Sequence, residues 1–236
     1  MTHNNQTYYD DFAGWYENER GKGYHALIDQ LELNIIRPLA ADKDVLEVGC
    51  GTGLLMKELT QATRSIKGID ISEQMLEKAK ARGLDVRQGV AEELPYADNS
   101  FDLVYSFKVL AHVEKIKEAM NEMNRVLRPG GYLVAEFYNA LSIRHLAKVL
   151  GGPGNISADR TEADVFCRWD TPKQVRSYIP HGTLFHGFKG VRVFTPAATA
   201  HKIPVVAPLL AKAEHWALHS PLSAFGGFLV AVSQKM

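Results

Sequence analysis

The sequence predicts an α/β fold in which helices flank a doubly wound, mostly parallel sheet of seven strands. Two patterns predict it. Short runs rich in β-branched residues alternate with longer helical runs along most of the chain. A glycine-rich turn, residues 49–53, follows the first of these runs and leads into a helix. A chain of 236 residues is within the usual size of one α/β domain, so we expect a single domain over 1–236.

Five strands and three helices are expected in the first 139 residues. One helix is expected to begin after Ser72, because Ser72 suits an N-cap and Glu73 adds negative charge in the first turn. A helix is expected to stop before the Pro-Gly-Gly sequence at 129–131. The strands are expected at 44–48, 65–70, 84–88, 101–107 and 132–137, and the other helices at 54–60 and 113–127.

The remaining third of the chain is less regular. A helix is expected over 141–150 and a loop over 151–155. Thr171, followed by Pro172 and with Gln174 three residues on, predicts a helix start of the capping-box type. Two further strands are expected at 191–194 and 227–233, with a helix over 201–219 between them.

Composition and charge exclude several classes of protein. The chain has 27 Lys and Arg against 27 Asp and Glu, so it lacks the excess of basic residues typical of nucleic-acid binding. Cys50 and Cys167 are the two cysteines, too few for a disulfide framework, which favours a reducing compartment. The polar N-terminus lacks a signal pattern, and no apolar run is long enough to span a bilayer. We therefore expect a cytoplasmic protein without integral membrane association or a nucleic-acid partner.

The strongest motif is the run from Val45 to Gly53. Glycine is needed where a strand turns sharply into a helix and where the backbone approaches a ligand closely. A dinucleotide fingerprint wants Gly or Ala at the position of Leu54, so a dehydrogenase is disfavoured. Glu47 precedes the first glycine by two residues and would repel a pyrophosphate, but would attract an ammonium or a sulfonium. Asp70, which ends the second predicted strand, can accept both hydroxyls of a ribose.

These residues together describe an adenosine ligand with a ribose, no phosphates and positive charge near Glu47. S-adenosylmethionine fits that description. The alternative is a plain tight turn beside a surface acid. A further alternative, from a different class, is a partner-binding or regulatory protein that binds the cofactor but does not transfer a methyl group. The intact Glu47, glycines and Asp70 argue against lost cofactor binding, although not against lost catalysis.

At these residues the chain resembles the class I S-adenosylmethionine-dependent methyltransferases, with their Rossmann-like methyltransferase fold. The resemblance is to the small-molecule branch that includes the ubiquinone/menaquinone C-methyltransferases. It is specific over residues 40 to 137 and rests on the segments 45–53, 68–76, 89–96, 100–102, 109–113 and 125–131.

The resemblance implies a set of cofactor contacts. The glycine loop, Gly49, Cys50, Gly51 and Gly53, should pass under the methionine part, with Glu47 near its amino group. Asp70 should hold the ribose. The adenine should be bounded by Ile71, Met75, Ala91 and Glu92. One position departs from the family, which often has Asp before that alanine, whereas this chain has Val90.

The first 38 residues are dense in aromatic side chains and are expected to form helices that close over the cofactor. Phe12, Trp15, Tyr16 and Glu19 lie at helical spacings. We expect Tyr8 or Tyr16 to face the transferred methyl group and Arg20 to bind the carboxylate of the cofactor. The alternative is a helix packed on the sheet with tyrosines at its rim.

Candidates for the chemistry follow the fourth and fifth strands. Methyl transfer from a sulfonium depends mainly on alignment, and a general base matters chiefly for a hydroxyl acceptor. His112 is the candidate base, although a structural histidine is the alternative. We expect Tyr138 and Asn139 to face the acceptor, with the cofactor-binding core at 40–139. Arg168 and Trp169 lie in a substrate-selecting insertion, 140–183, before C-terminal strands and a helix over 184–236.

The sequence therefore predicts an enzyme that transfers a methyl group to an O, C or N atom of a small organic acceptor. The aromatic N-terminal segment and the apolar stretch 203–210 favour an aromatic or lipophilic acceptor. We expect no metal site, and a monomer or homodimer.

Overall fold

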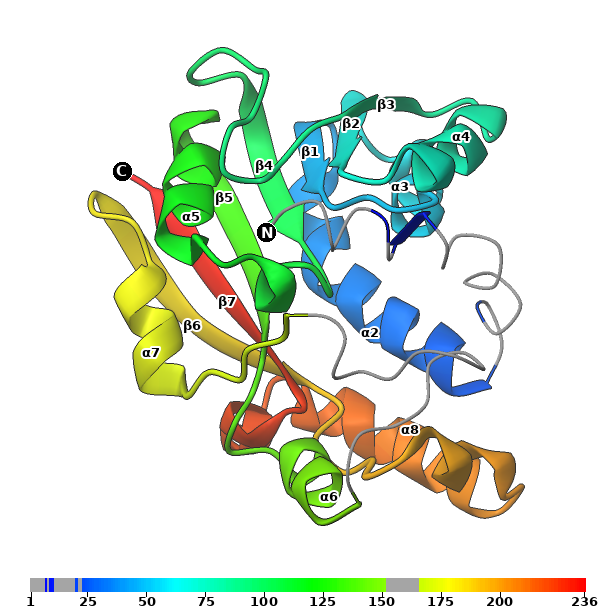
Figure 1. The fold of residues 1–236 in the computed structure, drawn as a ribbon. Helices are drawn as coiled ribbons and strands as arrows, with labels where there is room; N and C mark the ends of the chain where they lie inside the picture. Colours follow the sequence, from blue (N-terminus) through cyan, green and yellow to red (C-terminus); the bar gives the residue numbers. More distant parts are fainter. Residues whose placement is uncertain (1–6, 8, 11–19, 21–22, 152–165) are drawn as a thin grey trace.

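The computed structural model describes residues 7, 9–10, 20, 23–151 and 166–236 (Figure 1). Seven strands form one sheet in the order β3-β2-β1-β4-β5-β7-β6. The first five strands are parallel, whereas β7 runs antiparallel to both β5 and β6. The predicted seven-stranded, mostly parallel sheet is thus confirmed. The strands are β1 (Asp44–Val48), β2 (Ser65–Asp70), β3 (Asp85–Gln88), β4 (Phe101–Ser106), β5 (Leu127–Tyr138), β6 (Thr183–Val191) and β7 (Phe228–Lys235).

Helices cover both faces of the sheet (Figure 1). On one face α2 (Gly23–Ala40) packs its buried side against alternate residues of β1, β4, β5 and β7. On the other face α5 (Ile116–Arg125) and α7 (Pro172–Tyr178) pack against the intervening residues. Successive side chains of a strand point to opposite faces of the sheet, so a strand that is buried on both faces packs alternate residues against the two layers of helices. The remaining α-helices are α3 (Leu54–Leu59), α4 (Glu73–Ala81), α6 (Ile143–Gly151) and α8 (Val206–Ala217).

Two predicted helix starts are confirmed by their capping bonds. The hydroxyl of Ser72 accepts the amide of Met75 at 3.2 Å, which satisfies one of the unpaired N–H groups of the first turn of α4. At α7, Thr171 and Gln174 form the predicted reciprocal capping box, with Pro172 at the first helical position. These local signals act within a few residues, so the sequence alone was sufficient to locate them.

The strand predicted at 191–194 is wrong: β6 lies at 183–191. A register shift between Phe185 and Gly187 interrupts the alternation of side chains between the two faces of β6, so the sequence pattern does not reveal this strand. The backbone of Arg192, with φ of 62°, ends the strand where the prediction began it. The helix predicted over 201–219 is divided into a 3₁₀ helix, Ala198–Lys202, and α8, with Pro204 between them.

The residues after Arg192 are held by Glu214 of α8 instead of by a neighbouring strand. The fully buried carboxylate of Glu214 accepts the amides of Val193, Phe194 and Thr195 at 2.7–2.9 Å. It also accepts the hydroxyl of Thr195 at 2.8 Å. One carboxylate thus satisfies three consecutive backbone amides and fixes α8 to the end of β6.

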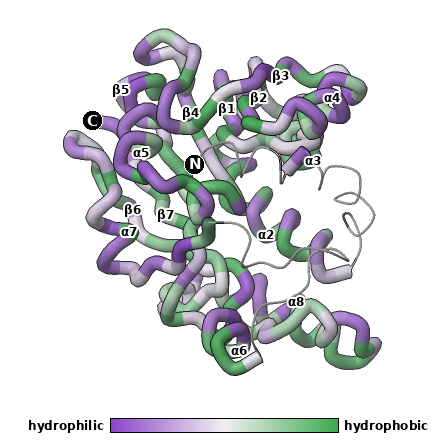
Figure 2. Tube along the Cα trace, in the orientation of Figure 1, coloured by the Kyte–Doolittle hydropathy of each residue, from purple (hydrophilic) through white to green (hydrophobic). Residues whose placement is uncertain are grey.

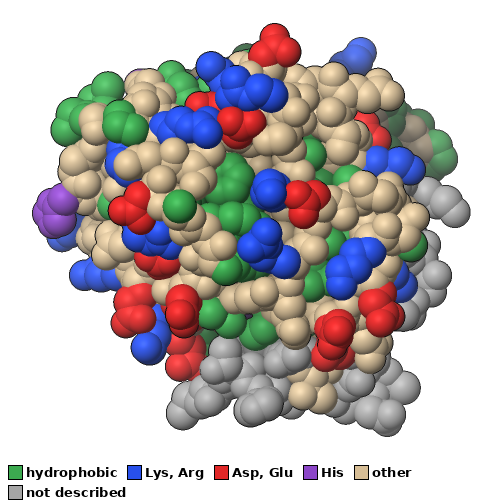
Figure 3. Space-filling view, turned by 90° about the horizontal axis from the view of Figure 1, so that it is seen from above, with side chains coloured by type: hydrophobic (Ala, Val, Ile, Leu, Met, Phe, Trp, Pro, Cys, Tyr) green, Lys and Arg blue, Asp and Glu red, His purple; other side chains and the backbone are tan. Residues whose placement is uncertain are grey.

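Charge is mixed on the face seen from above in Figure 3, where acidic and basic side chains are interspersed. Near the amino ends of β1, β2, β4 and β5, acidic and basic side chains pair with one another. Arg64 and Arg128 each form ion pairs of 2.8–2.9 Å with Asp44 and Asp102. The face therefore presents no continuous patch of one sign.

We predict that Glu214→Ala lowers the free energy of unfolding by about 3 kcal/mol, because it leaves buried amides without an acceptor. Urea unfolding followed by circular dichroism measures the change. Glu118→Ala is the matched control, since Glu118 is exposed and pairs only with Lys115, and it should cost less than about 0.5 kcal/mol. Equal losses in the two variants would contradict the anchoring role.

Candidate active site

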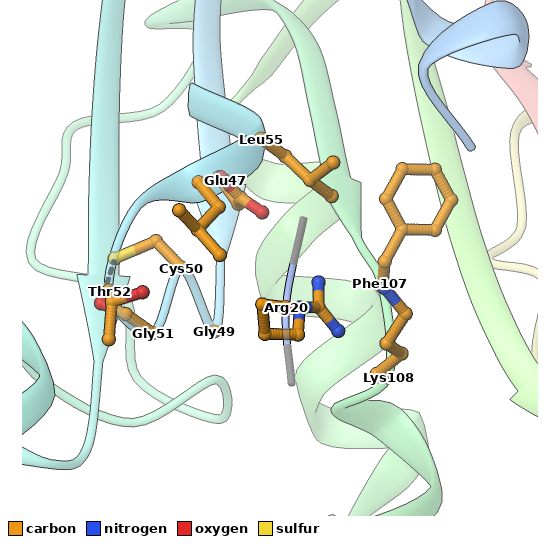
Figure 4. Close-up of a pocket in the computed structure, with 10 residues that line it drawn as sticks. Arg20, Glu47, Gly49, Cys50, Gly51, Thr52, Leu55, Phe107 and Lys108 are labelled. Atoms are coloured by element: carbon orange, nitrogen blue, oxygen red, sulfur yellow. Dashed lines mark hydrogen bonds between the residues drawn. The ribbon is translucent and has the colours of Figure 1, made fainter. Parts of the chain in front are cut away.

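A pocket opens at the carboxyl ends of β1 and β4, where the sheet meets the start of α3 (Figure 4). This is the edge at which ligands bind in open parallel sheets. The predicted cofactor residues of β1 and its loop lie here. The lining residues are Arg20, Glu47, Gly49, Cys50, Gly51, Thr52, Leu54, Leu55, Phe107 and Lys108.

The three glycines of the loop have different roles. All three have positive φ, at 79° for Gly49, 52° for Gly51 and 76° for Gly53. A Cβ on Gly49 would lie 2.1 Å from Val109, and one on Gly53 would lie 2.2 Å from Leu84. A Cβ on Gly51 would meet nothing within 4 Å. The outer glycines therefore permit close packing, whereas the middle one leaves open space at the pocket.

Asp70 is bonded directly to this loop. Its Oδ2 accepts the amide of Gly51 at 2.7 Å, and its Oδ1 accepts the amide of Ser72 at 2.9 Å. Burial raises the pKa of Asp70, while these backbone amides oppose the shift by stabilising the charged form. A carboxylate has about four acceptor positions, so each oxygen keeps a lone pair for another donor.

Glu47 lies beneath the loop on β1, with 4% of its surface exposed. Its neighbour in the sheet register is Tyr105 of β4, whose hydroxyl donates to Glu47 Oε2 at 2.9 Å. Burial raises the pKa of Glu47 to about 8, although the tyrosine hydrogen bond opposes the shift. A carboxyl group at the pocket wall whose pKa lies near neutral pH will ionise most readily beside a cation.

A second set of charges borders the pocket on the side of α2. The Nζ of Lys108 lies 2.7 Å from Glu32 Oε2 and 3.0 Å from Asp29 Oδ1, and Arg20 pairs with the same Asp29 at 2.6 Å. The backbone amide of Lys108 donates to Glu136 Oε1 at 3.0 Å. Burial raises the pKa of both Glu32 and Glu136. These carboxyls were missed in the sequence because they lie in otherwise ordinary helix and strand patterns.

Lys108 also has an unusual backbone. Its φ is 62°, in the left-handed region that residues with a side chain seldom adopt. Such positions cluster at functional sites, where the surroundings hold the strain. The sequence signal was its place two residues after the end of β4, at the ligand-binding edge.

Two residues of the predicted adenine side, Met75 of α4 and Ala91 of the loop after β3, are largely buried. Met75 is 3% exposed and Ala91 is 8% exposed, whereas Ile71 and Glu92 are half-buried. Cys50 packs against β2, because a Cβ on Gly68 would lie 2.7 Å from its sulfur. Burial raises the pKa of the Cys50 thiol, so the sulfur serves as a packing group.

His112 and Tyr138 meet beyond the pocket, at the ends of β4 and β5. The Nδ1 of His112 lies 2.8 Å from the carbonyl oxygen of Phe166. Since a carbonyl can only accept, Nδ1 carries the hydrogen and Nε2 is the acceptor of the neutral ring. That Nε2 lies 3.5 Å from the hydroxyl of Tyr138. Trp169 packs against Tyr138 with ring centroids 5.4 Å apart.

Two predicted acceptor contacts are occupied by the protein itself. Asn139 is fully buried, and its amide nitrogen donates to the carbonyls of Ala224 and Gly226. The expectation that Asn139 faces the acceptor is therefore corrected: it anchors the chain after β5. Arg168 pairs with Asp170 at 2.9 Å and lies over the ring of Tyr178. Tyr8 and Tyr16 lie outside the described residues.

Comparison with known proteins supports the resemblance drawn from the sequence. Residues 46–135 match the family described as a methyltransferase domain. The chain is 36% identical over 104 residues to a probable S-adenosylmethionine-dependent methyltransferase of Mycolicibacterium smegmatis, which covers 43% of this chain and 40% of that protein. It is 41% identical over 97 residues to a demethylmenaquinone methyltransferase of Staphylococcus aureus, over 38% of this chain and 40% of that protein.

These matches all fall in the core of the chain, where residues 46–135 are similar to methyltransferase domains. The chain spans about two-fifths of the length of the curated relatives it matches. A crystal structure from Thermotoga maritima, described as a possible histamine N-methyltransferase, has the same fold. It matches with a TM-score of 0.71 and 23% identity over 100% of both chains.

The buried proton of Glu47 gives a testable pH dependence. The folded chain keeps this proton up to about pH 8, whereas an unfolded glutamate loses it near pH 4.3. The free energy of unfolding therefore falls as the pH rises between these values and levels off above them. We predict that the free energy of unfolding of Glu47→Gln rises relative to that of wild type by about 5 kcal/mol across this pH window, measured by urea unfolding at several pH values. A difference between the two proteins that is constant with pH would contradict the assignment.

The glycine roles are tested by a matched pair of alanine variants. Gly49→Ala should cost about 3 kcal/mol or more in urea unfolding, because its Cβ would overlap Val109 at positive φ. Gly51→Ala should cost only about 1 kcal/mol, the penalty of a left-handed backbone without a clash. The reverse order would show that the middle glycine, not the first, is the packed one.

Proposed function

We propose that this protein transfers a methyl group from S-adenosylmethionine to a small organic acceptor. The observation that carries the proposal is one pocket lined by the buried Glu47 and by Gly51, which leaves open space there. Asp70 adjoins this pocket, because its carboxylate accepts a hydrogen bond from the Gly51 amide. A pocket of this kind suits a ligand with a cation and a ribose but without phosphates. The matching methyltransferase domain, residues 46–135, supports the same ligand.

The residues present fit the cofactor. Glu47 would hold its ammonium group, and the guanidinium of Arg20, which lines the same pocket, would face its carboxylate. The Cβ-free surface of Gly51 would let the methionine chain lie close to the backbone. Asp70 would accept the ribose hydroxyls with its remaining lone pairs.

The adenine side of the cofactor would be bounded by Ile71 and Met75 on one side of the ring, and by Ala91 and Glu92 at its edge. Val90 offers no acceptor for the adenine amine at the position where the resembled family often has Asp. We therefore assign recognition of that edge to backbone groups of 90–92, alone or with the carboxylate of Glu92.

The bound cofactor supplies an activated methyl group on its sulfonium. The task of the protein is then to align the acceptor and to exclude water. His112 is the candidate base for a hydroxyl acceptor, because the Phe166 carbonyl fixes its hydrogen on Nδ1 and leaves Nε2 to take a proton. The ring of Tyr138 and the indole of Trp169 would border the acceptor.

Aromatic side chains around His112 favour an aromatic or lipophilic acceptor. Tyr138 lies edge-on to His112, at 5.6 Å between ring centroids, and Tyr9 approaches the same imidazole at 6.1 Å. Aromatic rings prefer such offset or edge-on neighbours, and an aromatic acceptor would add another. Oxygen, carbon and nitrogen acceptors are all compatible with this arrangement.

The first test is calorimetric titration of the purified chain with S-adenosylmethionine, S-adenosylhomocysteine and NADH. We predict micromolar binding of the first two, and a loss of about tenfold or more in Asp70→Ala, which removes the ribose acceptor. Asp85→Ala is the matched control, because Asp85 is an exposed strand acid paired with Lys67.

Binding of NADH in place of the sulfonium ligand would overturn the proposal in favour of a dehydrogenase. Binding of S-adenosylmethionine without turnover, across a panel of phenol, amine and activated-carbon acceptors, would favour the regulatory alternative. Methyl transfer to any acceptor, detected as S-adenosylhomocysteine formation, would support the enzyme.

A further inference from the structure

Helix α6 turns its polar side toward the protein and its apolar side outward. The guanidinium of Arg144 lies 4.2 Å from the ring centroid of Tyr138, 4.5 Å from that of Phe228 and 4.8 Å from that of Trp169. The Nζ of Lys148 lies 5.5 Å from the same indole. No residue of α6 is buried. The large apolar side chains of α6 and of Leu141, just before it, are exposed: Leu141 53%, Ile143 47%, Leu146 58%, Val149 66% and Leu150 79%. A surface helix normally does the opposite.

Helix α8 presents a second apolar stripe. Leu209 is 63% exposed and Trp216 is 64% exposed, and the two are seven residues apart, which places them on one side of the helix. Val205, just before α8, is 73% exposed and lies four residues before Leu209. The opposite side is fixed, since Glu214 bonds to the backbone after β6. The helix therefore cannot turn its apolar stripe inward without breaking these bonds.

Helices α6 and α8 lie at one end of the molecule (Figure 1), and green stretches alternate with purple ones along both in Figure 2. We call residues 141–150 and 203–225 the apolar end. Among the described residues, eleven of the fourteen large hydrophobic side chains that are strongly exposed belong to it. A concentration of this kind on a soluble surface marks an interaction site.

The charge of the apolar end indicates what covers it. The charged residues of the apolar end are Arg144, Lys148, Lys212 and Glu214, and Glu214 is fully buried, so the charge left at the surface is positive. The whole chain is balanced, with 27 basic and 27 acidic residues, so this local excess is specific to the apolar end. Apolar side chains rimmed by cations are complementary to the headgroups and acyl chains of an anionic bilayer.

A second copy of the chain fits this surface less well. An isologous dimer through the apolar end would bring the same lysines of both copies together, and the one carboxylate of these segments, Glu214, is buried and cannot neutralise them. A bilayer surface suits the remaining features. Trp216 has the amphipathic ring that is enriched at membrane–water interfaces, and long lysine side chains can lie along apolar surface with the ammonium in water.

We infer that α6 and α8 form a docking surface for an anionic lipid bilayer, with Leu146, Leu150, Leu209 and Trp216 entering the headgroup region. No described helix is long and apolar enough to cross a membrane, so docking would be peripheral. Helix α6 begins five residues after Tyr138, so the docked surface adjoins the proposed acceptor side. A lipophilic acceptor could then pass from the bilayer to the site. The docking itself does not depend on the proposed methyl transfer.

The test is cosedimentation of the purified full chain with vesicles of phosphatidylcholine, with and without phosphatidylglycerol. We expect binding to the vesicles that contain phosphatidylglycerol, reduced by added salt. Two double variants, Leu146→Asn with Leu150→Asn and Leu209→Asn with Trp216→Ser, should each weaken the partition by about tenfold or more. Leu184→Asn is the matched control, because Leu184 is 53% exposed on β6, outside the apolar end, and should bind like wild type.

Absence of wild-type binding to phosphatidylglycerol vesicles would overturn the inference. An equal loss in Leu184→Asn would also overturn it, as would unchanged binding in both double variants. Sedimentation velocity provides a further check, because a stable dimer that the double variants dissociate would assign the apolar end to a second copy. Thermal unfolding of each variant confirms that it is folded. Titration with S-adenosylmethionine gives a separate readout, so failed docking with intact cofactor binding would leave the proposed function standing.

Discussion

The hydrogen bond from the Gly51 amide to Asp70, 2.7 Å long, joins the first two strands at the edge where the pocket forms. It can exist only because Gly49 and Gly53 allow the loop to turn against Val109 and Leu84. The same loop is held from below, since the amides of Gly49 and Cys50 both donate to the carbonyl of Ile69. The pocket wall is therefore built from backbone that is fixed at both ends before any ligand arrives, which lowers the cost of ordering a binding site.

Electrostatic balance is the second constraint on this site. Four carboxyl groups, those of Asp29, Glu32, Glu47 and Glu136, are near two cations, Arg20 and Lys108. An uncompensated buried charge is expensive, and a carboxyl group in that position holds its proton instead. Burial accordingly raises the pKa of Glu32, Glu47 and Glu136. A ligand that brings its own positive charge would favour ionisation of Glu47, which couples cofactor binding to proton release.

The sequence was sufficient to predict those parts of the fold and site that depend on local chemistry. The cap at Ser72, the capping box at Thr171 and the glycine turn each act within a few residues. The charged groups around Lys108 were missed because Glu32 and Glu136 are more than a hundred residues apart in the sequence and meet only through packing of α2 on the sheet. Asn139 was misread for a similar reason: its partners, Ala224 and Gly226, come from the far end of the chain.

Helix α6 illustrates a further limit of sequence patterns. The prediction of a helix over 141–150 is confirmed, but a sequence pattern does not say which side of the helix faces the protein. The side is decided by Tyr138, Trp169 and Phe228, whose rings form a surface that attracts a guanidinium. Tyr138 and Phe228 are direct neighbours in the β5–β7 register, so the sheet itself builds this aromatic surface. Once Arg144 occupies it, the leucines of α6 must point outward, and the fold thereby creates an exposed apolar surface beside the proposed acceptor site.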